Sequence, residues 1–241
     1  HIKSKYPGFI FMAEAYWDLE WDLQQLGFDY TYDKKLTDRL LRGNVTEISA
    51  HLMAEQAYQM KSVRFIENHD EERAVTVFGK YRSMAAAVII STLQGMRFYN
   101  DGQLEGRKTK LPVQLGRQPA EQPDKCLKSF YDNLLKITKD DIFESGKWTL
   151  LQPLPSWTDN PTFENMLAWL WTKKNENRLV IINYSDEHSQ CRIRLDVSGF
   201  EDQLTLKDLL TGENYVRSTE EIYHEGLYID LKAFQSHIFS F

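Results

Sequence analysis

Four apolar, strand-like runs alternate with helical patterns before residue 140, and this alternation constrains the fold more than any other feature. The strand-like runs cover 9–17, 27–36, 63–70 and 95–103, and the helical patterns cover 37–60, 81–93 and 125–138. Strands that alternate with helices predict a parallel sheet whose strands are joined by crossover helices. The first part of the chain is therefore expected to have an α/β fold.

The pattern changes near residue 150. The Pro-rich segment Gln152–Pro161 is followed by short strands that no helical pattern separates. Within Cys191–Val197 apolar and charged residues alternate, which is the period of a half-buried antiparallel strand. The strand-like runs, separated by turn residues, are 166–172, 178–184, 191–197, 204–210, 227–231 and 237–241. We therefore predict two domains, an α/β unit over 1–150 and an all-β antiparallel sandwich over 151–241.

Composition argues against several classes of partner. The 241 residues are 42% hydrophobic and 27% charged, which is typical of a soluble globular protein. A net charge of -6 without any Lys/Arg run argues against nucleic acid as a partner. The longest apolar run, Met84–Ile90, is too short to cross a bilayer, so no membrane partner is expected. Cys126 and Cys191 match no disulfide or zinc pattern, which favours a reducing, cytoplasmic location.

Two carboxylates stand at the ends of predicted strands. Glu14 ends the first strand beside Tyr16 and Trp17, and Asp70 ends the third strand beside His69. The carboxyl ends of parallel strands are where α/β barrels place their chemistry. Glycoside hydrolysis needs one acid to protonate the leaving oxygen and negative charge to stabilise an oxocarbenium-like transition state. Neighbouring aromatic rings would help an acid to keep its proton by removing water from it.

Each of these residues also has a purely structural interpretation. A carboxylate at a strand end is more often solvated or ion-paired than catalytic, and a single His such as His69 is more often a hydrogen-bonded structural residue. Arg73 could pair with Glu67 or with Asp70. The spacing of these residues does not by itself identify a sugar as the substrate.

The stretch "FIENHDEER" resembles the strand-seven motif of the α-amylase family (glycoside hydrolase family 13). Five residues fit that pattern, namely Phe65, Asn68, His69, Asp70 and Arg73. "FMAEAYW" is similar to the family's strand-five motif, "GFDYTYDKKLTDRLL" to its sixth strand and helix, and "GMRFYNDGQLEG" to its eighth strand. "LKDLLTGENY" and "SHIFSF" resemble its C-terminal β-sandwich. The resemblance therefore covers nearly the whole chain.

This resemblance implies the second half (strands five to eight) of a (β/α)8 TIM barrel, followed by an antiparallel β-sandwich domain. It implies that Glu14 is the general acid/base and that Asp70 stabilises the transition state. It implies no cofactor within this chain. The substrate-binding residues that it implies are His69, Asn68, Tyr16, Trp17 and Arg73.

The implied activity is that of a retaining glycosidase or transglycosidase acting on α-glucans or oligosaccharides. Such an enzyme needs a nucleophilic Asp at the end of strand four, which would lie upstream, as would any calcium ligands. This chain is therefore expected to be a fragment that is inactive alone. Its unpaired strand edges, at 9–17 and 95–103, are expected to be covered by an N-terminal half-barrel or a second copy. The alternative is a non-catalytic glucan-binding or structural relative.

Overall fold

The computed structural model describes all 241 residues, and it confirms the parallel sheet predicted for the first part of the chain. Four strands lie side by side in sequence order, and each pairs in parallel with the next. They are β1 (Met12–Ala13), β2 (Tyr30–Tyr32), β3 (Ser62–Arg64) and β4 (Met96–Arg97). The carboxyl ends of the four strands therefore lie at the same edge of the sheet.

The paired strands are much shorter than the apolar runs in the sequence. Of the range 9–17 only Met12–Ala13 forms ladder pairs, because β1 is an edge strand with β2 as its one neighbour. The chain leaves the strand direction soon afterwards, since Trp17 and Asp18 both adopt a left-handed backbone with φ of 63° and 65°. Most of the remaining residues of these runs lie in the loops that carry the polar groups, whereas Lys34 to Leu36 begin the next helix.

Helices flank the sheet. The helical pattern predicted over 37–60 is confirmed, and it is divided into three helices. Gly43, with φ of 81°, ends the first of them, and the Asn44 side chain caps the next by accepting from the Glu47 N–H at 3.1 Å. None of the helices is both long and apolar enough to cross a membrane. The helices of this part are α1 (Ile2–Lys5), α2 (Glu20–Gln25), α3 (Lys34–Arg42), α4 (Val45–Leu52), α5 (Gln56–Met60), α6 (Ala74–Val77), α7 (Lys80–Thr92), α8 (Lys125–Ile137) and α9 (Ile142–Ser145).

The C-terminal part contains the antiparallel strands that the sequence predicts. A six-stranded sheet has the order β10-β9-β12-β7-β6-β5, and a two-stranded sheet pairs β11 with β8. Buried side chains of both sheets form one core between them. Four elements were not predicted, namely β5, β10, the short helix α10 and a 3-10 helix. The elements are β5 (Lys147–Leu151), a 3-10 helix (Pro161–Asn165), β6 (Met166–Lys173), β7 (Glu176–Asn183), β8 (Ser189–Ile193), β9 (Gln203–Asp208), β10 (Asn214–Ser218), α10 (Thr219–Glu225), β11 (Leu227–Leu231) and β12 (Ser236–Ser240).

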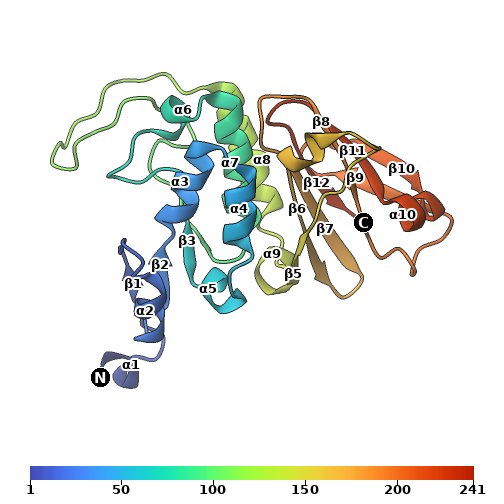
Figure 1. The fold of residues 1–241 in the computed structure, drawn as a ribbon. Coiled ribbons are helices and arrows are strands. Elements are labelled where there is room, and N and C mark those ends of the chain that lie inside the picture. The colour runs from blue at the N-terminus through green and yellow to red at the C-terminus, as the bar shows by residue number, and fades with distance from the viewer.

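The α/β part and the β-domain share a core. The helices α7 and α8 stand between the parallel strands and the large antiparallel sheet (Figure 1). Buried residues of α7 and α8 belong to the same apolar cluster as Trp169 and Trp171 of β6. The indole N–H of Trp171 donates to the Thr92 carbonyl at 2.7 Å, which ties β6 to the end of α7. The strand β5 pairs with β6 from Lys147 onward, so this sheet begins four residues before the predicted boundary at 151.

A buried ionic network lies at the end of β2. The Asp33 side chain is fully buried and receives bonds from Arg64 of β3 and from His51 Nε2 at 2.9 Å. It also caps α3 by accepting from the Leu36 N–H at 3.1 Å. Burial alone would raise the pKa of Asp33, but the charge of Arg64 and the contact with His51 lower that pKa to about 2. The carboxylate therefore stays ionised in the folded protein.

Replacing Asp33 with Asn is expected to destabilise the protein at neutral pH by about 3–5 kcal/mol, because Arg64 would keep a buried charge without its partner. The pKa of Asp33 is lower in the folded state than in the unfolded chain. The ionised Asp33 carboxylate therefore stabilises the folded protein above pH ~4, and this stabilisation is lost as the pH falls toward 2. The difference in unfolding free energy between wild type and Asp33→Asn should shrink over that interval, as measured by urea titration at several pH values.

The exposed residue Asp202 provides the control for this experiment. Asp202→Asn should change the unfolding free energy by no more than about 0.5 kcal/mol at any of these pH values. A constant difference between wild type and Asp33→Asn from pH 7 to pH 2 would contradict the assignment.

Candidate functional site

The structure brings Glu14, His69 and Asp70 together at the carboxyl edge of the parallel sheet. Glu14 follows β1 directly, whereas His69 and Asp70 follow β3 by a few residues. One carboxylate oxygen of each acid and one imidazole nitrogen all lie within 4.8 Å of one another, and all three residues are exposed. This separation allows the two carboxylates to contact the same sugar ring. The grouping agrees with the predicted site, and the catalytic roles themselves remain predictions.

A turn built by Asn68 directs His69 and Asp70 outward. The chain is buried from β3 as far as Asn68 and is exposed at the next two residues. The Asn68 Oδ1 atom accepts from the backbone N–H groups of Asp70 and Glu71, both at 2.9 Å. Such side-chain bonds to the following backbone reverse the chain direction. Asn68 therefore shapes the loop, and its own Nδ2 atom is buried without a hydrogen bond.

The aromatic residues after β1 contact Glu14 unequally. The Tyr16 hydroxyl donates to Glu14 Oε1 at 2.9 Å. Burial raises the pKa of Tyr16, and the Glu14 carboxylate raises it further. Trp17 packs edge-on against Tyr16 with ring centroids 5.8 Å apart, but its side chain is 83% exposed. The expectation that these rings would shield Glu14 from water is therefore wrong for this chain by itself, because Glu14 stays exposed.

Arg73 pairs with Glu67 rather than with Asp70, which corrects its prediction as a substrate-binding residue, whereas its predicted role as a support behind Asp70 stays a prediction. Its guanidinium is buried and donates to Glu67 Oε1 at 2.7 Å. The same group donates to the carbonyls of Asp101 at 2.6 Å and Thr109 at 3.1 Å. The Glu67 alternative from the sequence is therefore correct. Burial of both charges explains the pairing, because an unpaired charge would be strongly destabilising there.

Sequence reasoning missed how the loop after β4 reaches the site. Lys110 donates from Nζ to the Asp70 carbonyl at 2.6 Å. Glu121 holds the same loop by accepting from the N–H groups of Lys108 at 2.8 Å and Thr109 at 3.1 Å. These backbone bonds lower the pKa of Glu121. No motif in the sequence marks these contacts, since they join residues about 40 and 13 positions apart.

A cavity of about 370 Å³ opens beside Asp70. Its lining residues come from the loops after β1 and β3, from the start of α2 and from α3. Tyr16 and Trp17 provide aromatic surface, and the ion pair between Lys34 and Glu71, at 3.2 Å, also lines the cavity. The volume is that of a small-molecule site. The cavity therefore offers rings, charges and hydroxyl-binding groups next to the paired carboxylates.

The same three side chains are also the one group of His, Cys, Asp and Glu residues whose geometry could hold a metal ion. Two carboxylates and one imidazole form a mixed oxygen and nitrogen set, which suits zinc better than calcium, whose sites use six to eight oxygens. Because all three side chains are exposed, their geometry does not favour binding of a metal ion over binding of a sugar hydroxyl.

Comparisons with known proteins show which chains and folds resemble this one. No protein-family model matches the chain. The α-amylase MalA of Haloarcula japonica is 26% identical over 152 residues, which are 62% of this chain and 21% of MalA. The fold matches the maltogenic α-amylase AmyB of Thermotoga neapolitana with a TM-score of 0.77 and 19% identity, over 99% of this chain and 56% of AmyB.

Two further structures have the same fold. The α-amylase of Geobacillus thermoleovorans, solved with acarbose, matches with a TM-score of 0.74 and 14% identity, over 99% of this chain and 54% of that one. The debranching enzyme of Nostoc punctiforme matches with a TM-score of 0.71 and 14% identity, over 99% and 52%. The chain thus spans about half the length of these solved relatives. Its resemblance to the α-amylase family is confirmed, in sequence by a curated α-amylase and in fold along almost its entire length.

Proposed function

We propose that this chain forms part of a retaining glycosidase or transglycosidase that acts on α-glucans. Its share of that enzyme would be strands five to eight of a (β/α)8 barrel and the C-terminal β-domain. The observation that carries the proposal is the convergence of Glu14, His69 and Asp70 within 4.8 Å at the carboxyl edge of a parallel sheet. The α-amylase fold of the chain supports the same conclusion.

In this proposal Glu14 protonates the leaving glycosidic oxygen, and the same residue later removes a proton from the incoming water or sugar hydroxyl. The hydrogen bond from Tyr16 fixes the orientation of its carboxyl group. Asp70 supplies negative charge to the oxocarbenium-like ring. His69, whose Nε2 lies 3.4 Å from Asp70 Oδ2, binds hydroxyls of the same ring.

The nucleophile of this enzyme comes from polypeptide outside the 241 residues. A retaining mechanism needs a second carboxylate, the nucleophile, about 5 Å from the acid/base. Asp70 does not fill this role in the proposal, because it stabilises the transition state. The edge strand β1 offers unpaired backbone and exposed apolar side chains, at Phe9, Ile10 and Met12. A preceding half-barrel, or a second copy of the chain, would pair with this edge and bury those side chains.

Arg73 acts on the site indirectly. Its bonds to Glu67 and to the Asp101 and Thr109 carbonyls join the β3 loop to the loop after β4. Lys110, next to Thr109 in sequence, then holds the Asp70 carbonyl. We assign Arg73 the role of a positioning residue that keeps Asp70 in place.

Glu14→Gln is expected to lower kcat by about 10²- to 10⁴-fold in the enzyme assembled with its preceding half-barrel, because the proton donor is lost. Binding of maltooligosaccharides should persist, since the amide keeps the shape of the carboxyl group. Steady-state kinetics and calorimetric titration measure the two effects. Glu201→Gln, at an exposed position of the β-domain, is the control and should keep wild-type kcat. Turnover at the wild-type rate in Glu14→Gln would show that another group donates the proton.

The 241-residue chain alone is expected to release no glucose or maltose from maltooligosaccharides, because no glycosyl-enzyme forms without the nucleophile. Adding the separately produced upstream half of the barrel should restore turnover. Product analysis by chromatography, with each half alone as the control, tests this expectation. Hydrolysis by the isolated chain would refute the assignment, and inactivity of the reconstituted pair would favour a non-catalytic glucan-binding relative.

Arg73→Met is expected to destabilise the chain by about 3–5 kcal/mol, because the Glu67 carboxylate would stay buried without its cation. Arg73→Lys keeps the charge but lacks the fork that reaches both loop carbonyls. In the assembled enzyme Arg73→Lys should lower kcat by up to about 10²-fold through displacement of Asp70. Urea unfolding, proteolysis of the loop over 107–123 and kinetics provide the readouts. A kcat unchanged in Arg73→Lys would leave Arg73 with a structural role alone.

A further inference from the structure

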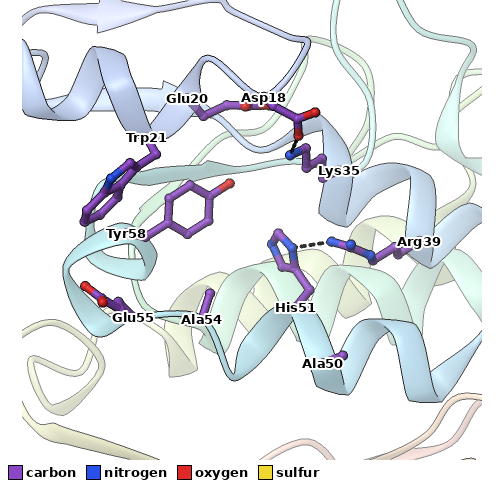
Figure 2. A pocket seen from close by; sticks show the side chains of 10 residues that line it. All are labelled: Asp18, Glu20, Trp21, Lys35, Arg39, Ala50, His51, Ala54, Glu55 and Tyr58. Atoms are coloured by element: carbon purple, nitrogen blue, oxygen red, sulfur yellow. Dashed lines mark hydrogen bonds and ion pairs between the residues drawn. The ribbon is translucent and has the colours of Figure 1, made fainter.

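A second pocket, of about 510 Å³, lies among the helices α2 to α5 and includes none of the carboxylates assigned to catalysis. Figure 2 shows Trp21, Tyr58 and Glu55 on one side of this pocket and His51 and Arg39 on the other. The Tyr58 hydroxyl points into the space between the two sides (Figure 2). The volume falls within the range of small-ligand sites.

Glu20 is an unpartnered acid in the wall of this pocket. The residue is 2% exposed, and its carboxylate makes no hydrogen bond or ion pair with any other side chain or backbone group. Burial and the charges of Asp33 and Glu20 raise the pKa of Tyr58, so the Glu20 carboxylate acts on the side of the pocket that holds the two rings. A buried charge without a partner is destabilising. A ligand that donates hydrogen bonds to Glu20 would remove this penalty.

The opposite side of the pocket carries a cation that no acid balances. Arg39 forms no salt bridge, and its one side-chain hydrogen bond goes to His51 Nδ1. Because a guanidinium can only donate, Nδ1 accepts this bond, and His51 Nε2 donates to Asp33 at 2.9 Å. An imidazole that accepts at one nitrogen and donates at the other is neutral. The positive charge on this side therefore belongs to Arg39, and most of its N–H donors remain available to a ligand.

The unpaired charges are separated across the pocket. Lys35 and Asp18 pair with each other and cancel. Glu55 forms no ion pair and does not cap α5 with its side chain. Negative charge without a partner is therefore found at Glu20 and Glu55, on the side of the rings, and positive charge without an acidic partner at Arg39.

The aromatic rings strengthen this separation. The faces of Trp21 and Tyr58 carry negative partial charge, so they attract an ammonium group that lies over them. They also offer apolar surface to an aliphatic chain. The two rings and Glu20 together form a site for an organic cation, and Arg39 forms a site for a carboxylate.

No ligand with a single kind of charge suits both sides. An amine would leave Arg39 without a partner and would be repelled by it, and an anion would meet Glu20 and Glu55. A neutral ligand would balance neither charge. A molecule with an ammonium group at one end, a carboxylate at the other and an aliphatic chain between them satisfies all of these groups together.

We propose that this pocket binds a linear zwitterion, whose ammonium group lies at Trp21, Tyr58 and Glu20 and whose carboxylate is held by Arg39. The ligand class is that of the aliphatic amino acids with a terminal amine, which includes lysine. The carboxylates assigned to catalysis take no part in this binding. The inference is therefore independent of the proposed glycosidase activity.

Linear amino acids from 4-aminobutanoate to 8-aminooctanoate, titrated into the ¹⁵N-labelled chain of 241 residues, provide the test. We expect at least one of them to cause saturable shifts of the Trp21 indole N–H and of the Tyr58 backbone amide. The best member should bind about tenfold more tightly than its analogues that lack either the amine or the carboxylate, because each end forms charge-assisted bonds. For 6-aminohexanoate these analogues are hexanoate and hexylamine.

Two variants assign the ends of the ligand. Glu20→Gln should weaken binding of the zwitterion about tenfold and should not weaken binding of the carboxylate-only analogue. Arg39→Gln should weaken binding of the zwitterion to a similar extent and should not weaken binding of the amine-only analogue. Glu20→Gln keeps the side-chain volume and removes a buried charge without a partner, so it is expected to fold.

Asp22→Asn and Arg42→Gln provide matched controls. Both residues are exposed, lie on the same helices as Glu20 and Arg39, and do not line the pocket. Because exposed charges are screened by salt, these variants should bind the zwitterion within about twofold of wild type. Circular dichroism of each variant checks folding.

Equal affinity for the zwitterion and both analogues would overturn the inference, as would wild-type affinity in folded Glu20→Gln and Arg39→Gln. Shifts confined to Tyr16 and Trp17 would place the ligand in the other cavity and would also overturn it. Saturable shifts of Trp21 by maltotriose, with none by any zwitterion, would overturn the ligand class. Failure of the catalytic proposal, seen as persistent turnover in Glu14→Gln of the assembled enzyme, would change none of these outcomes.

Discussion

A single buried guanidinium, that of Arg64, joins the parallel strands on which the candidate site depends. It lies on β3 and reaches Asp33 at the end of β2, the Gln94 carbonyl before β4 at 3.0 Å, and Gln59 of α5. The strands themselves contribute only a few ladder pairs, so side-chain contacts of this kind fix their relative positions. Because a buried charge must keep its partners, the network specifies one arrangement of the loops that follow these strands.

The polar residues after β3 divide into two groups with opposite roles. Glu67 and Arg73 turn inward, pair with each other and hold the loop after β4. His69 and Asp70 turn outward, toward Glu14. Asn68 separates the groups through its bonds to the following backbone. A chain can therefore place an apolar strand directly before many charges, because half of those charges form the support for the other half.

The exposed edge of β1 contrasts with the continuous cores in the rest of the chain. The helical layer and the β-domain bury their apolar surfaces in continuous cores. The sheet edge at β1 leaves Phe9, Ile10 and Met12 exposed beside Glu14. In the proposed enzyme, the shielding of Glu14 from water would come from polypeptide that covers this edge.

The sequence by itself determined the parallel α/β part, the antiparallel strands after residue 160 and the convergence of Glu14 with Asp70, because hydrophobic period and motif order are local properties. It did not determine the division of 37–60 into three helices, the partner of Arg73 or the exposure of Glu14. Arg73 pairs with Glu67 rather than with Asp70, because Glu67 is buried beside it and Asp70 is exposed. The hydrogen bond from Lys110 to the Asp70 carbonyl came from tertiary structure alone, since it joins residues 40 positions apart in sequence.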